Sequence, residues 1–182
     1  MNIPSLPEGL RKRIEDLEGS LRDEDFHILV WGSGESAEQD YEKRKRIFNY
    51  LAEPERFGPN NVFMSEDIAF RPLVERYEHG VAEALQAGAV DAVVALDTSI
   101  GPHTEIALYA DILVGKTLVF VPHEHKESEG FARTAFVTLK AEGYTPEQYE
   151  SCNDICRMAN EFAQGLRLRK AKHGTLSNIF GG

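Results

Sequence analysis

The stretch from Asp91 to Glu105 reads DAVVALDTSIGPHTE and decides how this chain of 182 residues folds. A strand is predicted at 90–96, because residues 92–96 form a short apolar run of valine, alanine and leucine, which is typical of a strand buried on both faces. Pro102 suits the first turn of a helix, which we expect over 102–113. A second apolar run follows at 117–121. The segment therefore predicts one strand–helix–strand unit with parallel strands.

The same alternation of strands and helices runs through the rest of the chain. Further strands are predicted at 26–31, 61–64 and 136–139, and further helices at 38–51, 72–86 and 146–172. Alternating strands and helices favour a parallel sheet that is covered on both faces, and right-handed crossovers make it doubly wound. We therefore expect one flavodoxin-like α/β domain of about five mainly parallel strands in the order 2-1-3-4-5.

Three parts are expected along the chain. Residues 1–24 are highly charged with apolar residues at helical spacing, which predicts an amphipathic helix or arm. This arm could pack on the domain or on a partner subunit. Residues 25–173 should form the α/β domain, and residues 174–182 a flexible tail.

Composition narrows the class of protein. The formal net charge of -10 argues against a nucleic acid polymer as partner, because affinity for a phosphate backbone comes mainly from clustered cations. No run approaches the ~18 apolar residues of a membrane span, and no charged-then-apolar leader opens the chain. We expect a cytoplasmic protein. Cys152 and Cys156 lie four residues apart on a predicted helix and are interpreted as half-buried thiols, not as metal ligands.

Polar residues follow the predicted strands at the sheet edge where ligands bind. Gly32-Ser33 follows the first strand, and a glycine there lets backbone N–H groups approach a ligand. Glu66-Asp67 follows the second strand, and Asp97 the third. Glu105 then falls in the first turn of a helix, where a carboxylate most simply complements the helix dipole. Because residues 106–110 are apolar, this helix has few exposed sides, which favours a cleft position for Glu105.

Two carboxylates across a small cleft can cleave a glycosidic bond. One attacks the anomeric carbon or stabilises the oxocarbenium ion, and the other protonates the leaving group. The partner of Glu105 could be Asp97, Asp67 or Glu66, and His103 is an alternative acid because it titrates near neutral pH. Asp97 could instead hold a ribose hydroxyl. Spacing does not choose among these residues.

The segment from Ser99 to Glu105 resembles a known family. SIGPHTE after an apolar strand is similar to the S/D-x-G-x-G-x-E-x-G-x-A segment of nucleoside 2-deoxyribosyltransferases and deoxynucleoside 5'-monophosphate N-hydrolases. The resemblance implies that Glu105 is the nucleophile at C1′ of the sugar. It also implies that Ser99, which lies six residues earlier, contacts phosphate as in the monophosphate hydrolases. Gly101 matches the first glycine of the motif, whereas His103 stands at the second and could offer a proton donor.

The resemblance covers about residues 26–121. Gly32 and Ser33 are similar to the family's Gly-Ser turn after its first strand, and Tyr41 to a tyrosine that borders the sugar. Gly32, Ser33 and Ser99 would bind phosphate through amides and hydroxyls. Subunits of the family often complete each other's sites, which implies a homo-oligomer such as a dimer.

NAD-cleaving TIR domains are a second resemblance. They share the sheet and a Ser six residues before a catalytic Glu, and their loop after the second strand is similar in placement to residues 66–72. Their Trp-Cys pair in the Ser-to-Glu stretch is absent here. Both resemblances imply N-glycosidic bond cleavage with Glu105 at C1′. We expect an enzyme that cleaves or transfers this bond in a nucleoside monophosphate or related nucleotide, without metal or cofactor. The alternative from another class is a non-catalytic nucleotide-binding or assembly module.

Overall fold

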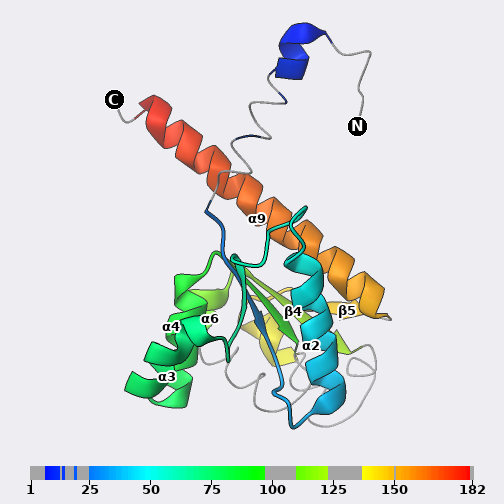
Figure 1. The fold of residues 1–182 in the computed structure, drawn as a ribbon, viewed down its shortest axis with the longest axis vertical. Helices are drawn as coiled ribbons and strands as arrows, with labels where there is room; N and C mark the ends of the chain where they lie inside the picture. The colour runs from blue at the N-terminus through cyan, green and yellow to red at the C-terminus, as the bar shows by residue number, and fades with distance from the viewer. Residues whose placement is uncertain are drawn as a thin grey trace.

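One sheet of five parallel strands forms the centre of the molecule, in the order β2-β1-β3-β4-β5. The structure is a computed structural model that describes residues 7–12, 14, 19, 25–96, 110–122, 137–149 and 151–180. The strands are β1 (Ile28–Trp31), β2 (Val62–Met64), β3 (Ala92–Leu96), β4 (Thr117–Pro122) and β5 (Glu147–Tyr149) (Figure 1). The expected doubly wound α/β class and the strand order 2-1-3-4-5 are confirmed.

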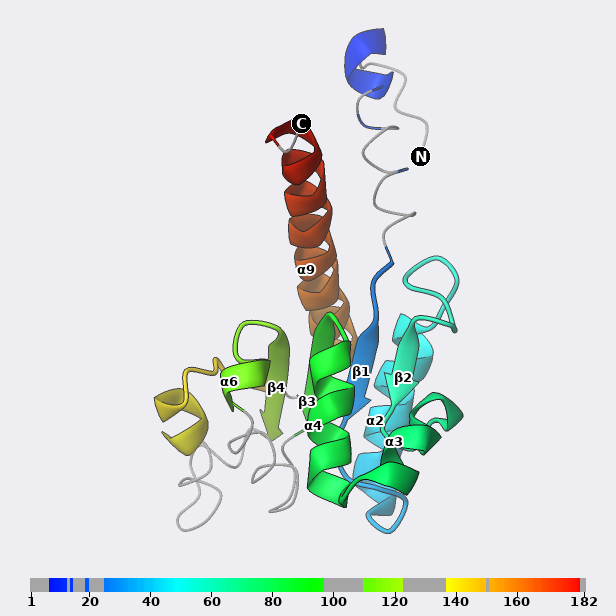
Figure 2. The ribbon, with the colours of Figure 1, turned by 90° about the vertical axis from the view of Figure 1, so that its left-hand side faces the viewer.

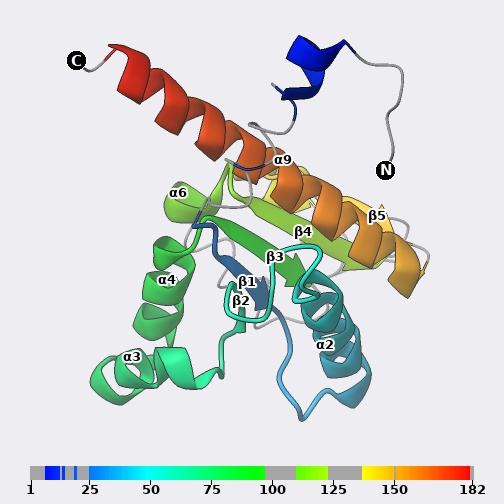
Figure 3. The same cartoon turned by 45° about the horizontal axis from the view of Figure 1, so that its top comes forward.

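Helices cover both faces of this sheet. On one face, α2 (Glu38–Leu51) and α9 (Cys152–Phe180) pack together over β1, β3 and β4. On the other face lie α4 (His79–Ala89) and α6 (Ala110–Leu113), each with a side chain in the core beneath them. Figure 3 shows α2 and α4 on opposite sides of the strands. The strands are buried from both sides, which is why β1 and β3 are apolar along their whole length.

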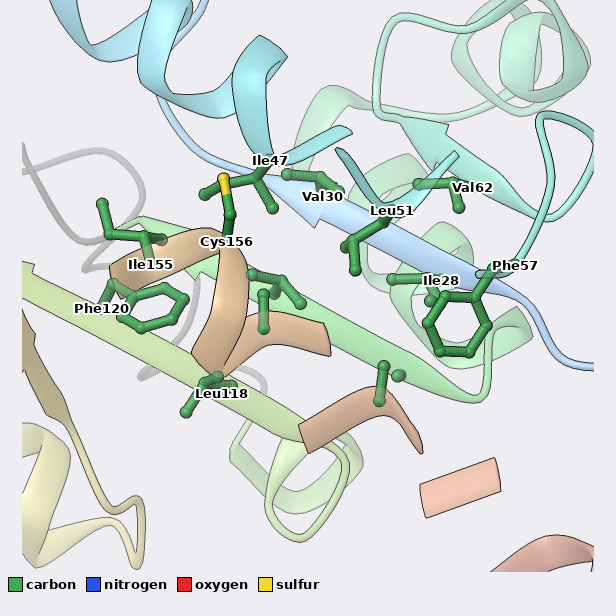
Figure 4. Close-up of a cluster of buried hydrophobic side chains, with 14 of the residues drawn as sticks. Ile28, Val30, Ile47, Leu51, Phe57, Val62, Leu118, Phe120, Ile155 and Cys156 are labelled. Carbon is green, nitrogen blue, oxygen red and sulfur yellow. The ribbon is translucent and has the colours of Figure 1, made fainter. Parts of the chain in front are cut away.

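The core under α2 and α9 is closely packed (Figure 4). Ile47 and Leu51 of α2 meet Val30 of β1, while Ile155 of α9 lies near Phe120 of β4, and all are almost completely buried. Figure 2 shows that α9 continues well beyond the sheet. Its helical backbone runs to Phe180, through most of the residues 174–182 that were expected to form a flexible tail.

The prediction of a strand at 136–139 is wrong. Residues 137–141 are helical, and Leu139 is fully buried in the core below the sheet, so this apolar run covers the sheet rather than extending it. A short apolar run fits either structure equally well. The fifth strand is instead β5, which is polar and half-buried at the sheet edge and was expected to be the start of a helix. The last helix therefore begins at Cys152, not at residue 146.

The single helix predicted over 72–86 is divided in two. A short 3-10 turn η1 (Ile68–Phe70) leads into α3 (Arg71–Arg76), and the extended backbone of Tyr77 separates it from α4. No residue of α3 is buried, whereas α4 packs Ala82 and Ala87 inward, so the chain must turn between them.

Most of the predicted arm at 1–24 lies outside the described residues. Within its described part, residues 8–12 are helical. In the ranges that the structure describes, no helix has the length and apolar character of a membrane span.

The two cysteines differ in their surroundings. Cys156 is buried in the core and burial raises the pKa of its thiol, while Cys152 is half-exposed at the start of α9. We expect iodoacetamide at pH 8 to alkylate Cys152 at least about tenfold faster than Cys156, because the thiolate is the nucleophile and access limits the buried thiol. Peptide mass mapping measures both rates. Unfolding in urea should remove the difference, and equal rates in the native protein would contradict the placement of Cys156.

Candidate functional site

A cleft of about 680 Å³ opens at the carboxyl ends of β1 and β2. Its walls come from the loop after β1, the loop after β2, the inward face of α2 and the start of α4. The lining residues are Gly32, Ser33, Gly34, Glu35, Ser36, Ala37, Arg44, Ser65, Glu66, His79 and Glu83. The strand order reverses between β1 and β3, where ligands of open α/β sheets bind, and the loop after β1 that lines the cleft borders this point. The cleft is therefore the candidate ligand site.

Gly32 lies in the floor of the cleft and packs against the end of β3. Its φ of +154° is a backbone conformation that side chains disfavour, and a Cβ there would lie 3.2 Å from Cβ of Leu96 and 3.5 Å from Cδ of Arg44. The glycine is thus needed for the close approach of β1, β3 and α2. The sequence predicted Gly32 and Ser33 at this edge, and both line the cleft. Ser33 is largely buried, with 8% of its surface exposed.

Arg44 is a cleft residue that the sequence analysis missed. It lies on the inward face of α2 and is only 1% exposed. Its Nη1 donates to the carbonyl oxygen of Gly32 at 2.8 Å, and its Nη2 forms an ion pair with the carboxylate of Glu66. A buried cation requires such partners. The only signal in the sequence is its spacing from Ile47, which places both residues on one helix face.

Tyr41 borders the cleft without lining its described part. Its hydroxyl donates to Oε1 of Glu35 at 3.4 Å, and its ring centre lies 5.3 Å from the guanidinium carbon of Arg44. Burial and the charges of Glu35 and Glu66 raise the pKa of Tyr41, so its hydroxyl remains a hydrogen-bond donor at neutral pH. Tyr41 thus connects the loop after β1 to Arg44.

The two carboxylates after β2 have different roles. Asp67 accepts a hydrogen bond from the backbone N–H of Met64 at 2.6 Å, which closes the turn at the end of the strand. It does not line the described part of the cleft, whereas the neighbouring Glu66 does. The turn is also fixed by Gln86, whose amide donates to the carbonyl oxygen of Ser65 at 3.2 Å. Of the two, Glu66 is the carboxylate that a ligand in the cleft can reach.

Helix α4 contributes two further residues to the cleft, His79 and Glu83, which the sequence analysis did not predict there. His79 is the exposed first residue of α4. Its Nε2 lies 3.3 Å from Oε1 of Glu83, and Glu83 is buried at 6% exposure. Both line the cleft. Their spacing of four residues was the available signal, because it places both side chains on one face of a helix.

The described cleft is acidic. Glu35, Glu66 and Glu83 provide three carboxylates, against one permanent cation at Arg44. Such a wall favours hydroxyl and amine donors, as well as positive charge, and disfavours a phosphate group beside it. Across the described ranges, no group of three or more side chains is arranged to hold a metal ion.

Five predicted site residues follow β3 directly. They are Asp97, Ser99, Gly101, His103 and Glu105, and all lie outside the described residues. The structure does describe how the chain enters this segment. Leu96, the last residue of β3, lies beside Gly32 of the cleft, and β3 pairs with β1 up to Trp31 and Ala95. The segment therefore begins at the edge of the cleft.

The fold and the cleft define a flavodoxin-like α/β protein with a candidate ligand site at the strand-order reversal. The sequence matches no model of a known protein family, and no curated protein matches it. The resemblances to N-glycosidic enzymes thus stay predictions that rest on the quoted residues.

Proposed function

We propose that this protein cleaves or transfers the N-glycosidic bond of a nucleoside monophosphate or related nucleotide, with Glu105 as the nucleophile. One observation carries the proposal: the end of β3, which leads to residues 97–105, lies against Gly32 in the floor of an acidic cleft. A carboxylate delivered to such a cleft is the main requirement of glycosidic catalysis.

In the proposed reaction, the Glu105 carboxylate attacks C1′ as the bond from C1′ to the base nitrogen breaks. The electron pair of that bond leaves with the base, which takes a proton from an acid, and Asp97 and His103 are the candidates that follow β3. Water, or a second base in a transfer, then attacks C1′ and gives its proton to the residue that acted as the acid, while the bond from C1′ to Glu105 breaks and the carboxylate is restored. We assign the sugar to the described part of the cleft, because its carboxylates can accept hydrogen bonds from hydroxyl groups. The phosphate would lie on the side of Ser99.

Hydrolysis of NAD, as in the TIR resemblance, is the second candidate. The acidic wall of Glu35, Glu66 and Glu83 supports it, because the nicotinamide ring of NAD is positively charged before the bond breaks. Loss of that charge on cleavage would also favour product release.

A nucleotide panel tests the proposal. The protein is incubated with deoxynucleoside and ribonucleoside monophosphates, nucleosides and NAD, and free base is measured by chromatography. We expect base release from at least one compound. A nucleotide that raises the melting temperature but is intact after long incubation would support the non-catalytic binding module. Absence of both effects would reject the proposed function.

We further propose that the protein acts in the cytoplasm as a homo-oligomer whose subunits complete each other's sites. This rests on the family resemblance, and light scattering during gel filtration measures the assembly directly. A monomer with full activity at low concentration would reject it.

A further inference from the structure

Glu66 is the carboxylate of the cleft that is both anchored and accessible. It follows β2, lines the cleft and has 44% of its side chain exposed, while its ion-pair partner Arg44 is 1% exposed. Oε1 of Glu66 is paired with Arg44, and Oε2 accepts a 3.2 Å hydrogen bond from the hydroxyl of Ser65. The protein therefore orients both carboxylate oxygens, while the exposed side of the carboxylate stays open to a ligand.

Arg44 is fixed by its own contacts in the cleft, so it can hold the carboxylate of Glu66 in position. Its Nη1 is bonded to the Gly32 carbonyl oxygen at 2.8 Å, and its guanidinium carbon lies 5.3 Å from the centre of the Tyr41 ring. Its Nε is buried and has no hydrogen-bond partner within the described residues. A planar guanidinium fixed at two points holds a carboxylate in one orientation, which a flexible lysine does not.

The other carboxylates of this region are less suited to contact a sugar. Asp67 is bonded to its own turn, and Glu83 is buried beside His79. Glu35 is exposed on a loop, where its contact is the 3.4 Å hydrogen bond from Tyr41. Precise placement within about 0.5 Å is what a catalytic or binding group requires. By that criterion, Glu66 is the best-placed acceptor of the described cleft.

We propose that Glu66 contacts the sugar of the substrate, and that Arg44 is the positioning residue for Glu66. This role of Glu66 rests on the proposed function. Glu66 accepts a hydrogen bond from a sugar hydroxyl, and its negative charge stabilises the positive charge that develops at C1′. Glu66 forms no covalent bond and transfers no proton in this role. The interaction strengthens as the charge develops, so it lowers the barrier more than it improves binding.

A double-mutant cycle tests both assignments. Glu66→Gln, Arg44→Lys and the double variant are compared with wild type on the compound that the nucleotide panel identifies. We expect Glu66→Gln to lower kcat about a hundredfold with KM changed less than about threefold. Arg44→Lys should lower kcat about tenfold in the wild-type background, and should have almost no further effect when Glu66 is already Gln.

Glu75→Gln is the matched control, because Glu75 is an exposed carboxylate on α3 whose partner is Arg71 at 3.7 Å. It should keep the wild-type rate, and thermal melting checks that each variant is folded. If Glu66→Gln does not fold, Arg44→Met with Glu66→Gln replaces it, because this pair removes both charges and leaves neither unpaired.

The outcomes separate the two proposals. Wild-type kcat in Glu66→Gln, together with an inactive Glu105→Gln, would overturn the role of Glu66 and leave the proposed function intact. Equal effects of Arg44→Lys in both backgrounds would overturn the positioning role of Arg44. If wild type releases no base from any compound, the proposed function fails and the sugar contact fails with it.

Discussion

Replacement of Glu105 by Gln is expected to reduce the release of free base by about a thousandfold or more, because a carboxamide cannot serve as the nucleophile at C1′. The variant keeps the size and the hydrogen-bonding ability of the side chain, so binding should be retained. Chromatography of the reaction under single-turnover conditions measures the rate of bond cleavage. The shift in melting temperature with the same nucleotide measures binding.

The competing interpretation of Glu105 is a helix-dipole interaction, which predicts a different result. Loss of such an interaction costs about 0.3–1 kcal/mol of stability and leaves the rate of catalysis unchanged. Asp111→Asn is the matched control, because Asp111 is an exposed carboxylate of α6 that does not line the described cleft. It should keep full activity with a small loss of stability. A Glu105→Gln variant that behaves in the same way would remove Glu105 from the mechanism.

The centre of the fold was predictable because it depends on local patterns. β1, β3 and β4 are continuous apolar runs, and only a sheet with helices on both faces buries such strands completely. The handedness of the crossovers then leaves few possible strand orders. The periphery was less predictable. β5 is a polar edge strand whose identity is set by its pairing with Phe120–Pro122, and no feature of its own sequence predicts it.

The candidate site was predictable at the level of the sheet edge. Gly32 and Ser33 were expected there because the carboxyl ends of parallel strands meet, and they do line the cleft. Arg44 could not be assigned in the same way. A charged residue on a helix is most often exposed, and its burial depends on Glu66 and the Gly32 carbonyl, which only the folded chain brings to it.

Gly32→Val is expected to lower the free energy of unfolding by about 3 kcal/mol, the largest loss of stability that we predict here. Two effects combine. The φ of +154° is unfavourable for a β-branched residue, and the added Cβ would lie 3.2 Å from Cβ of Leu96. Neither Leu96 nor Arg44 can move freely, because Leu96 is fully buried in β3 and Arg44 is bonded to the Gly32 carbonyl oxygen. Urea denaturation measures the change in unfolding free energy.

Gly34→Val separates this effect from the general cost of valine in a loop. A Cβ at Gly34 would meet no atom within 4 Å, and Gly34 does not have a positive φ. The loss of stability there should stay below about 1 kcal/mol, as for most exposed positions. Equal losses at both positions would show that loop flexibility, and not the contact between β1 and β3, explains the glycines. A large loss at Gly32 alone would mean that this glycine is required by the close packing that brings the end of β3 to the cleft.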